Sequence, residues 1–168
     1  MSSSQTESKG YKSYLEEDGG RKGIYKWILS TDHKRIALLY LYTMMGWFII
    51  GVVLGLLMKL ELIAPGKTLM EAQAYNATFT VHGVIMIFLI VIPGLPAVFG
   101  NFMLPIQIGA KDVFFPRLNL FSWYIYVLGG ILVIISLFGN GPPDTGWTFY
   151  APYSFKTGTN MLPAALGA

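Results

Sequence analysis

Three long apolar stretches alternate with short polar segments along this chain. Residues 36–58 and 118–138 contain no Asp, Glu, Lys or Arg, and the same holds for the residues between Ala72 and Ala110. A helix needs roughly 20 apolar residues to cross about 30 Å of hydrocarbon, and each stretch is long enough. We therefore predict an all-α integral membrane protein with transmembrane helices at about 36–58, 74–102 and 118–138, and the start of a fourth helix in the final residues, MLPAALGA.

Composition supports the membrane class and divides the chain in two. Of its 168 residues, 54% are hydrophobic and only 12% are charged. Soluble domains carry about twice that charged share. Residues 1–29 are polar and predict a cytoplasmic tail, with a short interfacial helix near residues 24–29, whereas residues 30–168 form the membrane part. Ser30, Thr31 and Asp32 precede the first span, and any of them could cap its helix.

The basic residues predict the orientation in the membrane. Lys and Arg number seven before Ile36, two in the first loop, two in the second and one in the third, which sums to the twelve in the chain. Because cytoplasmic loops are enriched in these residues, we predict a cytoplasmic N-terminus. The enrichment of Lys and Arg on the cytoplasmic side also accounts for the basic tail. We therefore do not expect nucleic-acid binding.

His82 is the first candidate site residue, because it is an ionisable group inside an apolar run. Polar groups within membranes need a partner, and imidazole is a common metal ligand and a usual axial ligand of haem iron. A structural histidine bonded to a backbone carbonyl is the alternative. The chain has no cysteine, so a metal would have to be held by histidine, carboxylate or another subunit.

One stretch carries a specific resemblance: YNATFTVHGVIMIFLIVIPGLPAVFGNFMLPIQIGAKDVFFPRLN, residues 75–119. It resembles the second transmembrane helix and following loop of subunit I of the haem-copper respiratory oxidases, the cytochrome c oxidase family. STDHKRIALLYLY before and within the first span, and GWTFYAP after the third, are similar to the same family. The resemblance runs from about Ser30 to the end and covers the first three of the family's usual twelve helices.

The resemblance implies a low-spin haem site, with a haem of the a type. His82 corresponds to one axial ligand, and Trp147 to a tryptophan that packs near the haem propionates. Lys59 stands where the family usually has an arginine bonded to the haem formyl group; a lysine lacks the guanidinium fork. Gly51 and Gly55 form a small-residue pair that suits either helix packing or a flat face for the macrocycle. His33, the other histidine, is predicted to be a structural residue at the cytoplasmic end.

The resemblance also implies a proton-uptake entrance and a candidate cation site. The family's pathway begins with an aspartate and two asparagines at positions that match Asp112, Asn101 and Asn119, and a tyrosine at the place of Tyr40 lies near this route. From its chemistry alone, Asp112 could equally be a solvated loop carboxylate. In some members, residues at the places of Glu61 and Gly66 bind a cation; a surface turn is the alternative.

The implied function is that of one part of a terminal oxidase. The whole enzyme would pass electrons from cytochrome c to oxygen and pump protons across the inner or plasma membrane of a prokaryote. The second axial ligand, the copper site and the second haem belong to later parts of the family's subunit. We therefore expect no catalytic residue in this stretch and no activity from this chain alone.

Partners and alternatives follow from the same comparison. The expected partners are the remainder of subunit I, the other oxidase subunits, cytochrome c as electron donor, and the lipid bilayer. The chain would be either the first part of a longer subunit, which we favour, or a natural piece completed by another chain. A quinol oxidase of the same family would share these residues, and a haem-free scaffold or assembly subunit is an alternative from a different class.

Overall fold

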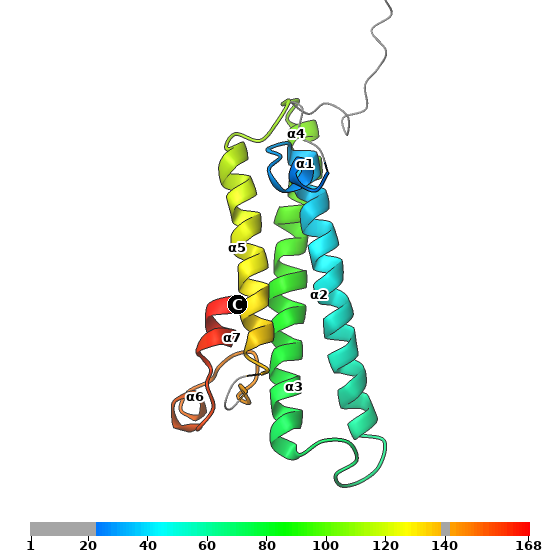
Figure 1. Ribbon diagram of the computed structural model, residues 1–168, viewed down its shortest axis with the longest axis vertical. Coiled ribbons are helices and arrows are strands. Elements are labelled where there is room, and N and C mark those ends of the chain that lie inside the picture. The colour runs from blue at the N-terminus through cyan, green and yellow to red at the C-terminus, as the bar shows by residue number, and fades with distance from the viewer. Residues whose placement is uncertain (1–22, 139–141) are drawn as a thin grey trace, which may run out of the picture.

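The computed structural model describes residues 23–138 and 142–168, and all regular secondary structure within these ranges is helical (Figure 1). The first long helix is α2 (His33–Glu61). The second is continuous in four segments, α3 (Ala72–Val84), η1 (Ile85–Val91), η2 (Gly94–Gly100) and α4 (Asn101–Gln107), and the third is α5 (Pro116–Ile135). Three candidate membrane spans, His33–Glu61, Ala72–Gln107 and Pro116–Ile135, confirm the predicted fold class.

The first and third spans begin at residues suited to helix starts. The Asp32 carboxylate accepts a hydrogen bond of 2.9 Å from the Lys34 amide, so Asp32 is the capping residue among the three candidates. Before it, α1 (Tyr25–Ile28) forms a single turn, as predicted for this segment, and the Tyr124 hydroxyl donates to the Ile28 carbonyl. Pro116 opens α5, where its missing N–H is not needed.

The second span changes its winding around its prolines. Segments η1 and η2 are π-helical, with a wider turn than the α-helix, and they flank Pro93. The Ile92 amide accordingly donates to the carbonyl of Ile87, five residues earlier. A proline cannot donate this bond and crowds the preceding turn, and a change of winding relieves both problems within an unbroken span.

The three spans pack around two apolar clusters. One cluster lies near the α1 end and is centred on Ile36, Tyr40 and Val98; the other lies further along the bundle and includes Val81, Val84 and Val133. The outward faces carry exposed apolar side chains on all three spans, such as Leu56, Leu95 and Leu128. Such a surface suits lipid or further apolar helices rather than water.

Glycines allow two close helix contacts. The Trp47 indole of α2 lies against Gly130 of α5, where an added Cβ would collide with the ring. Near the C-terminus, α6 (Tyr153–Lys156) precedes α7 (Leu162–Gly167), which packs on α5 with Gly167 against Gly129. Helix α7 is the predicted start of a fourth helix. The third span ends at Ile135, earlier than the predicted residue 138, because Leu137 and Phe138 form tight turns instead.

Loops gather at two opposite ends of the bundle (Figure 1). The start of α2 and the loop between α4 and α5 share one end, and the basic residues Lys34, Arg35, Lys111 and Arg117 line one cavity there. The loop between α2 and α3 lies at the other end, together with α6. This grouping agrees with the predicted cytoplasmic side, which stays a prediction. Of the predicted tail, residues 1–22 lie outside the described residues.

Candidate functional site: a histidine between two spans and a polar end of the bundle

His82 lies on α3 with its imidazole against α2. Its Nδ1 is 2.8 Å from the Gly51 carbonyl oxygen, and because a carbonyl only accepts, Nδ1 carries the proton. The ring also covers Gly55, where an added Cβ would be 3.1 Å from Cε1. Gly55 therefore leaves room for the imidazole, whereas Gly51 offers it a carbonyl and leaves room for Met86 of the second span, with an added Cβ 2.9 Å from the sulfur.

The other imidazole nitrogen, Nε2, has no hydrogen-bond partner within residues 23–138 and 142–168. With Nδ1 protonated, Nε2 presents a lone pair. A histidine that binds a metal usually donates its second ring N–H to a carbonyl or carboxylate, which fixes the tautomer and the ring orientation. The observed bond to Gly51 fits this pattern, with Nε2 open to a metal, and it equally fits the alternative of a structural histidine bonded to a carbonyl. The role of His82 as a ligand therefore stays a prediction.

A closed metal centre is not formed around His82. No group of three or more His, Cys, Asp or Glu side chains suited to a metal occurs in the described part of the chain. A metal bound at Nε2 would need its remaining ligands from elsewhere. Haem iron fits this requirement, because the macrocycle supplies four nitrogen ligands and the protein only the axial ones.

Trp147 packs on α3 at Gly83, the residue after His82. Its indole lies on Gly83, where an added Cβ would be 3.0 Å from the tryptophan Cβ and 3.1 Å from Cδ1. Phe88 contacts the same indole edge to face, with ring centroids 6.4 Å apart. Lys59 is exposed near the end of α2, four residues after Gly55 and hence on the same side of the helix. The sequence did not predict that Gly83 would receive Trp147. The position of Gly83 directly after His82 was the only indication of such a role.

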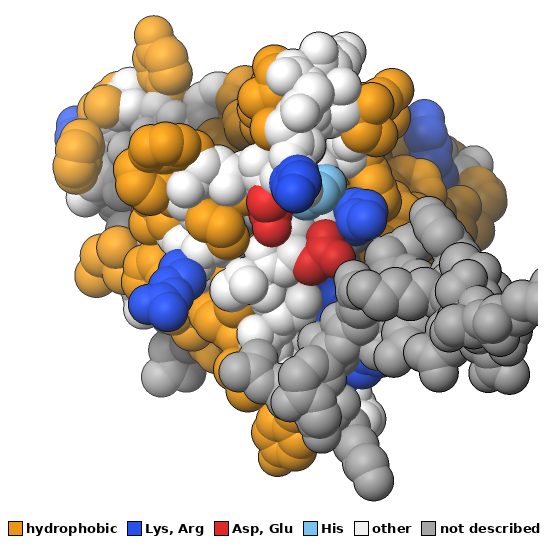
Figure 2. All heavy atoms as spheres, turned by 90° about the horizontal axis from the view of Figure 1, so that it is seen from above, with side chains coloured by type: hydrophobic (Ala, Val, Ile, Leu, Met, Phe, Trp, Pro, Cys, Tyr) orange, Lys and Arg blue, Asp and Glu red, His pale blue; other side chains and the backbone are white. Residues whose placement is uncertain are grey.

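The opposite end of the bundle holds Asp112 in a polar cavity of about 550 Å³, and Figure 2 shows acidic, basic and histidine side chains clustered on that face. The Asp112 carboxylate accepts from the Val113 amide at 2.7 Å and from His33 Nδ1 at 3.0 Å. Asp32 lies 3.7 Å from the same ring nitrogen. His33 is only 6% exposed. It is therefore a buried partner of Asp112 and not an exposed residue at the membrane interface.

The two asparagines form a reciprocal amide pair. Asn119 Nδ2 donates to Asn101 Oδ1 at 2.6 Å, and Asn101 Nδ2 donates back at 3.3 Å. The Ser122 hydroxyl donates to the Asn119 carbonyl at 2.7 Å, so its single proton is used and Tyr40 must donate to Ser122 at 2.8 Å. The structure thus joins three of the four predicted proton-pathway residues. Sequence reasoning missed Ser122, although it follows Asn119 by one helical turn.

Asp112 stands apart from this network. Asn101, Asn119 and Ser122 line a separate cavity of about 330 Å³, which Val113 borders and Asp112 does not. The described residues show no hydrogen bond between Asp112 and either asparagine. Water bridging between the two cavities is the arrangement through which they would cooperate.

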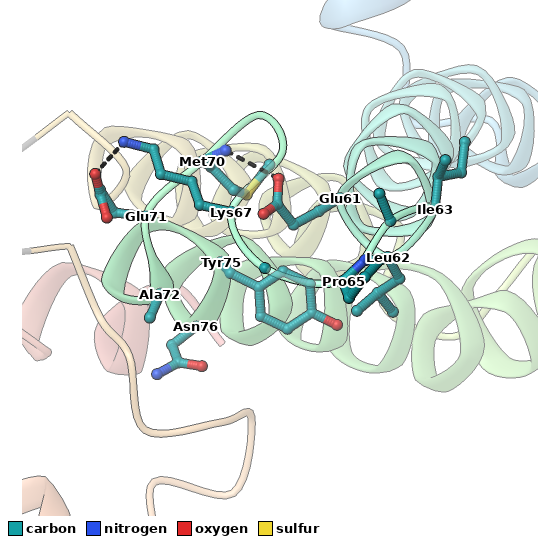
Figure 3. A pocket seen from close by; sticks show the side chains of 12 residues that line it. Glu61, Leu62, Ile63, Pro65, Lys67, Met70, Glu71, Ala72, Tyr75 and Asn76 are labelled. Atoms are coloured by element: carbon teal, nitrogen blue, oxygen red, sulfur yellow. Dashed lines mark hydrogen bonds and ion pairs between the residues drawn. The ribbon is translucent and has the colours of Figure 1, made fainter.

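Glu61 closes the loop between α2 and α3, at a cavity of about 670 Å³ (Figure 3). Its carboxylate accepts from three successive backbone amides, Thr68 and Met70 at 2.9 Å and Leu69 at 2.5 Å. Gly66 adopts a φ of +89°, which favours glycine in this turn. The carboxylate is thus engaged by backbone donors, while the candidate cation site at Glu61 and Gly66 stays a prediction.

Comparison with known proteins decides the family. Residues 35–168 match the family described as cytochrome c and quinol oxidase polypeptide I. The chain belongs to this oxidase subunit family. The match includes His82, Asp112 and Trp147, whereas His33 lies two residues before it begins.

Individual relatives of the oxidase family agree over most of this chain. It is 40% identical to cytochrome c oxidase subunit 1 of Corynebacterium glutamicum over 158 residues, and 41% identical to that of Alkalihalophilus pseudofirmus over 133 residues. These matches cover 88% and 79% of the chain. The heme-copper oxidase subunit I+III of Aeropyrum pernix is 41% identical over 86% of the chain.

The oxidase relatives are much longer than this chain. It spans 26% of the Corynebacterium subunit, 21% of the Alkalihalophilus subunit and 18% of the Aeropyrum protein. The family assignment therefore concerns one part of an oxidase subunit.

Proposed function

We propose that this chain contributes one axial ligand of a low-spin haem, of the a type, to a terminal respiratory oxidase, and also forms the entrance of a proton-uptake path. The enzyme would transfer electrons from cytochrome c to oxygen and pump protons. The observation that carries the proposal is the His82 ring, with Nδ1 bonded to Gly51 and Nε2 free, in a chain of the oxidase family.

The haem, when bound, accepts and passes on single electrons. His82 would hold the iron through Nε2, and the bond to the Gly51 carbonyl would keep the ring oriented and increase its basicity. Gly55 provides the space in which the imidazole lies. Trp147 covers the helix surface beside the ligand, and Lys59 supplies a positive charge at the end of α2, the place that the family resemblance gives to a contact with the haem formyl group.

Proton uptake would begin at the opposite end. Asp112 offers a carboxylate, which attracts protons, in a polar cavity that a second carboxylate, that of Asp32, also lines. The Asn101 and Asn119 amides both donate and accept, so they can hold a water chain behind it. Tyr40 extends this polar line through Ser122 into the first span.

The remainder of subunit I, with the second axial ligand, copper and a second haem, completes the enzyme together with its other subunits. The site is in the plasma membrane of a prokaryote, with the N-terminus in the cytoplasm. The family name covers quinol oxidases too, and the electron donor is not specified by these helices. A copper-bearing partner subunit would identify cytochrome c as the donor.

The haem assignment is tested by replacing each of the two histidines in the full oxidase. His82→Ala should abolish the low-spin haem band in the reduced-minus-oxidised spectrum, because the axial nitrogen is lost. His33→Ala removes the same group at the opposite end and should retain that band. An unchanged band in His82→Ala would refute the assignment and favour a haem-free scaffold.

The proton path is tested by Asp112→Asn, which removes the charge and keeps the size of the side chain. Proton uptake and turnover in vesicles should slow. Asp32→Asn is the matched control, since it changes the neighbouring carboxylate of the same cavity and keeps an oxygen to cap α2. Equal rates in Asp112→Asn and the wild type would count against the path.

A further inference from the structure

The loop that carries Trp147 is attached to α3 at Thr80, two residues before the haem-ligand candidate His82. The Gly146 amide donates to Thr80 Oγ1 at 2.9 Å, and Thr80 in turn donates to the Asn76 carbonyl at 2.7 Å. Thr80 is fully buried. Gly146 has a φ of +81°, a conformation that other residues rarely adopt, so the turn before Trp147 depends on glycine. These contacts place the indole on Gly83, next to His82.

One carboxylate joins this turn to the second half of the loop. Asp144 Oδ1 accepts from Thr157 Oγ1 at 3.1 Å and from Thr159 Oγ1 at 3.0 Å, and Oδ2 accepts from the Tyr153 hydroxyl at 3.1 Å. The two threonine hydroxyls also lie 3.0 Å from each other. Asp144 therefore accepts hydrogen bonds from three hydroxyl groups in α6 and the turn that follows it.

Few other polar contacts connect the two halves. Within the described residues, the only additional hydrogen bond between segments 142–148 and 153–161 runs from Thr145 Oγ1 to Met161 Sδ, at 3.3 Å. Sulfur is a weak acceptor, whereas a carboxylate forms the stronger, charge-assisted bonds. Asp144 is thus the main polar link across the loop.

We propose that Asp144 is a positioning residue that holds the loop closed and thereby keeps Trp147 packed on Gly83 of α3, the residue after His82. The effect on the haem rests on the proposed function of His82; the effect on the loop does not. If Asp144 is removed, Thr157, Thr159 and Tyr153 lose their common acceptor, and the segment around α6 is released. Trp147 then keeps the attachment of its own turn to Thr80, its contacts with Gly83 and Phe88, and the weak link from Thr145 to Met161, so its indole is held less firmly.

Two independent changes in the full oxidase test this role. Asp144→Ala removes the acceptor, and the double variant Thr157→Val with Thr159→Val removes two of its donors without changing the carboxylate. Thr148→Val is the matched control, because Thr148 is exposed and forms no hydrogen bond in the described part of the chain. Asp144→Asn keeps one acceptor oxygen and should behave between Asp144→Ala and the wild type.

The first readout is independent of haem. Lys156 is exposed in α6, and trypsin cleavage after it reports how often the loop opens. Cleavage should become roughly tenfold faster in Asp144→Ala and in the double threonine variant, and stay unchanged in Thr148→Val. Wild-type cleavage rates in both loop variants would overturn the proposal.

The second readout is the spectrum and midpoint potential of the low-spin haem. Both should shift in the two loop variants and not in the control, since Trp147 packs on the residue that follows the candidate ligand in α3. Faster cleavage with an unaltered haem would overturn the positioning role. If the haem band survives in His82→Ala, the proposed function fails, and the cleavage experiment still decides whether Asp144 closes the loop.

Discussion

Gly55→Ala should disturb the His82 ring while leaving the overall stability nearly unchanged. The new methyl group would lie 3.1 Å from Cε1, 3.5 Å from Nδ1 and 3.9 Å from Nε2 of His82. Carbon atoms pack best at about 3.5–4.0 Å, so the ring must retreat from α2 by roughly 0.4 Å or more. The acceptor of its hydrogen bond, the Gly51 carbonyl, is also on α2, so the same movement lengthens that bond.

The size of the effect follows from these distances. The bond from Nδ1 to the Gly51 oxygen is 2.8 Å long, and a retreat of about 0.4 Å brings it to the outer limit of a normal hydrogen bond. Losing much of it costs about 1 kcal/mol. Alanine is favoured over glycine within a helix by about 1 kcal/mol, so the two effects nearly cancel in the free energy of unfolding. The displacement of the ring is not cancelled. If it costs about 1 kcal/mol of the free energy of haem binding, haem affinity falls about fivefold.

Gly46→Ala provides the control within the same helix. A Cβ at Gly46 would have no other atom within 4 Å, so this variant gains the helix propensity alone. We would purify both variants of the full oxidase, determine haem per protein from the reduced-minus-oxidised spectrum, and follow thermal unfolding by circular dichroism. The reasoning is refuted if Gly55→Ala matches Gly46→Ala in both haem content and thermal stability.

Three further predictions concern other contacts. Asn119→Ala breaks the reciprocal pair with Asn101 and should lower the free energy of unfolding by about 1–2 kcal/mol in thermal melts, and an unchanged melt would contradict it. Glu61→Ala removes the acceptor of three loop amides, so hydrogen exchange of these amides should accelerate; equal exchange would show that the loop holds without it. The hydrogen bond to Asp144 raises the pKa of the Tyr153 hydroxyl, so this bond contributes fully below about pH 10 and is lost as the pH rises through the raised pKa. Asp144→Asn should return the pKa of Tyr153 toward its ordinary value in a tyrosine NMR titration, and no change would contradict the contact.

The spans and the family motif could be read from local sequence because both depend on neighbouring residues. A membrane helix satisfies its backbone internally and requires only a long apolar run, so the three spans follow from composition. The position of the last span's end did not follow, since the turns at Leu137 and Phe138 are no less apolar than the helix before them. The capping role of Asp32 among three adjacent candidates also depended on the local geometry.

Contacts between distant segments were decided only by the tertiary structure. The bond from His82 to Gly51 joins residues 31 apart, and the one from His33 to Asp112 joins residues 79 apart. Apolar patterning shows which segments are helices, but not which carbonyl faces an imidazole or which hydroxyls meet at Asp144. These pairings follow from how glycines let the helices approach and from where the loops fold back. The sequence by itself therefore determined the membrane helices, the family resemblance and the candidate ligand, whereas packing determined that the His82 ring is oriented by α2 and that Trp147 packs on Gly83, the residue after it.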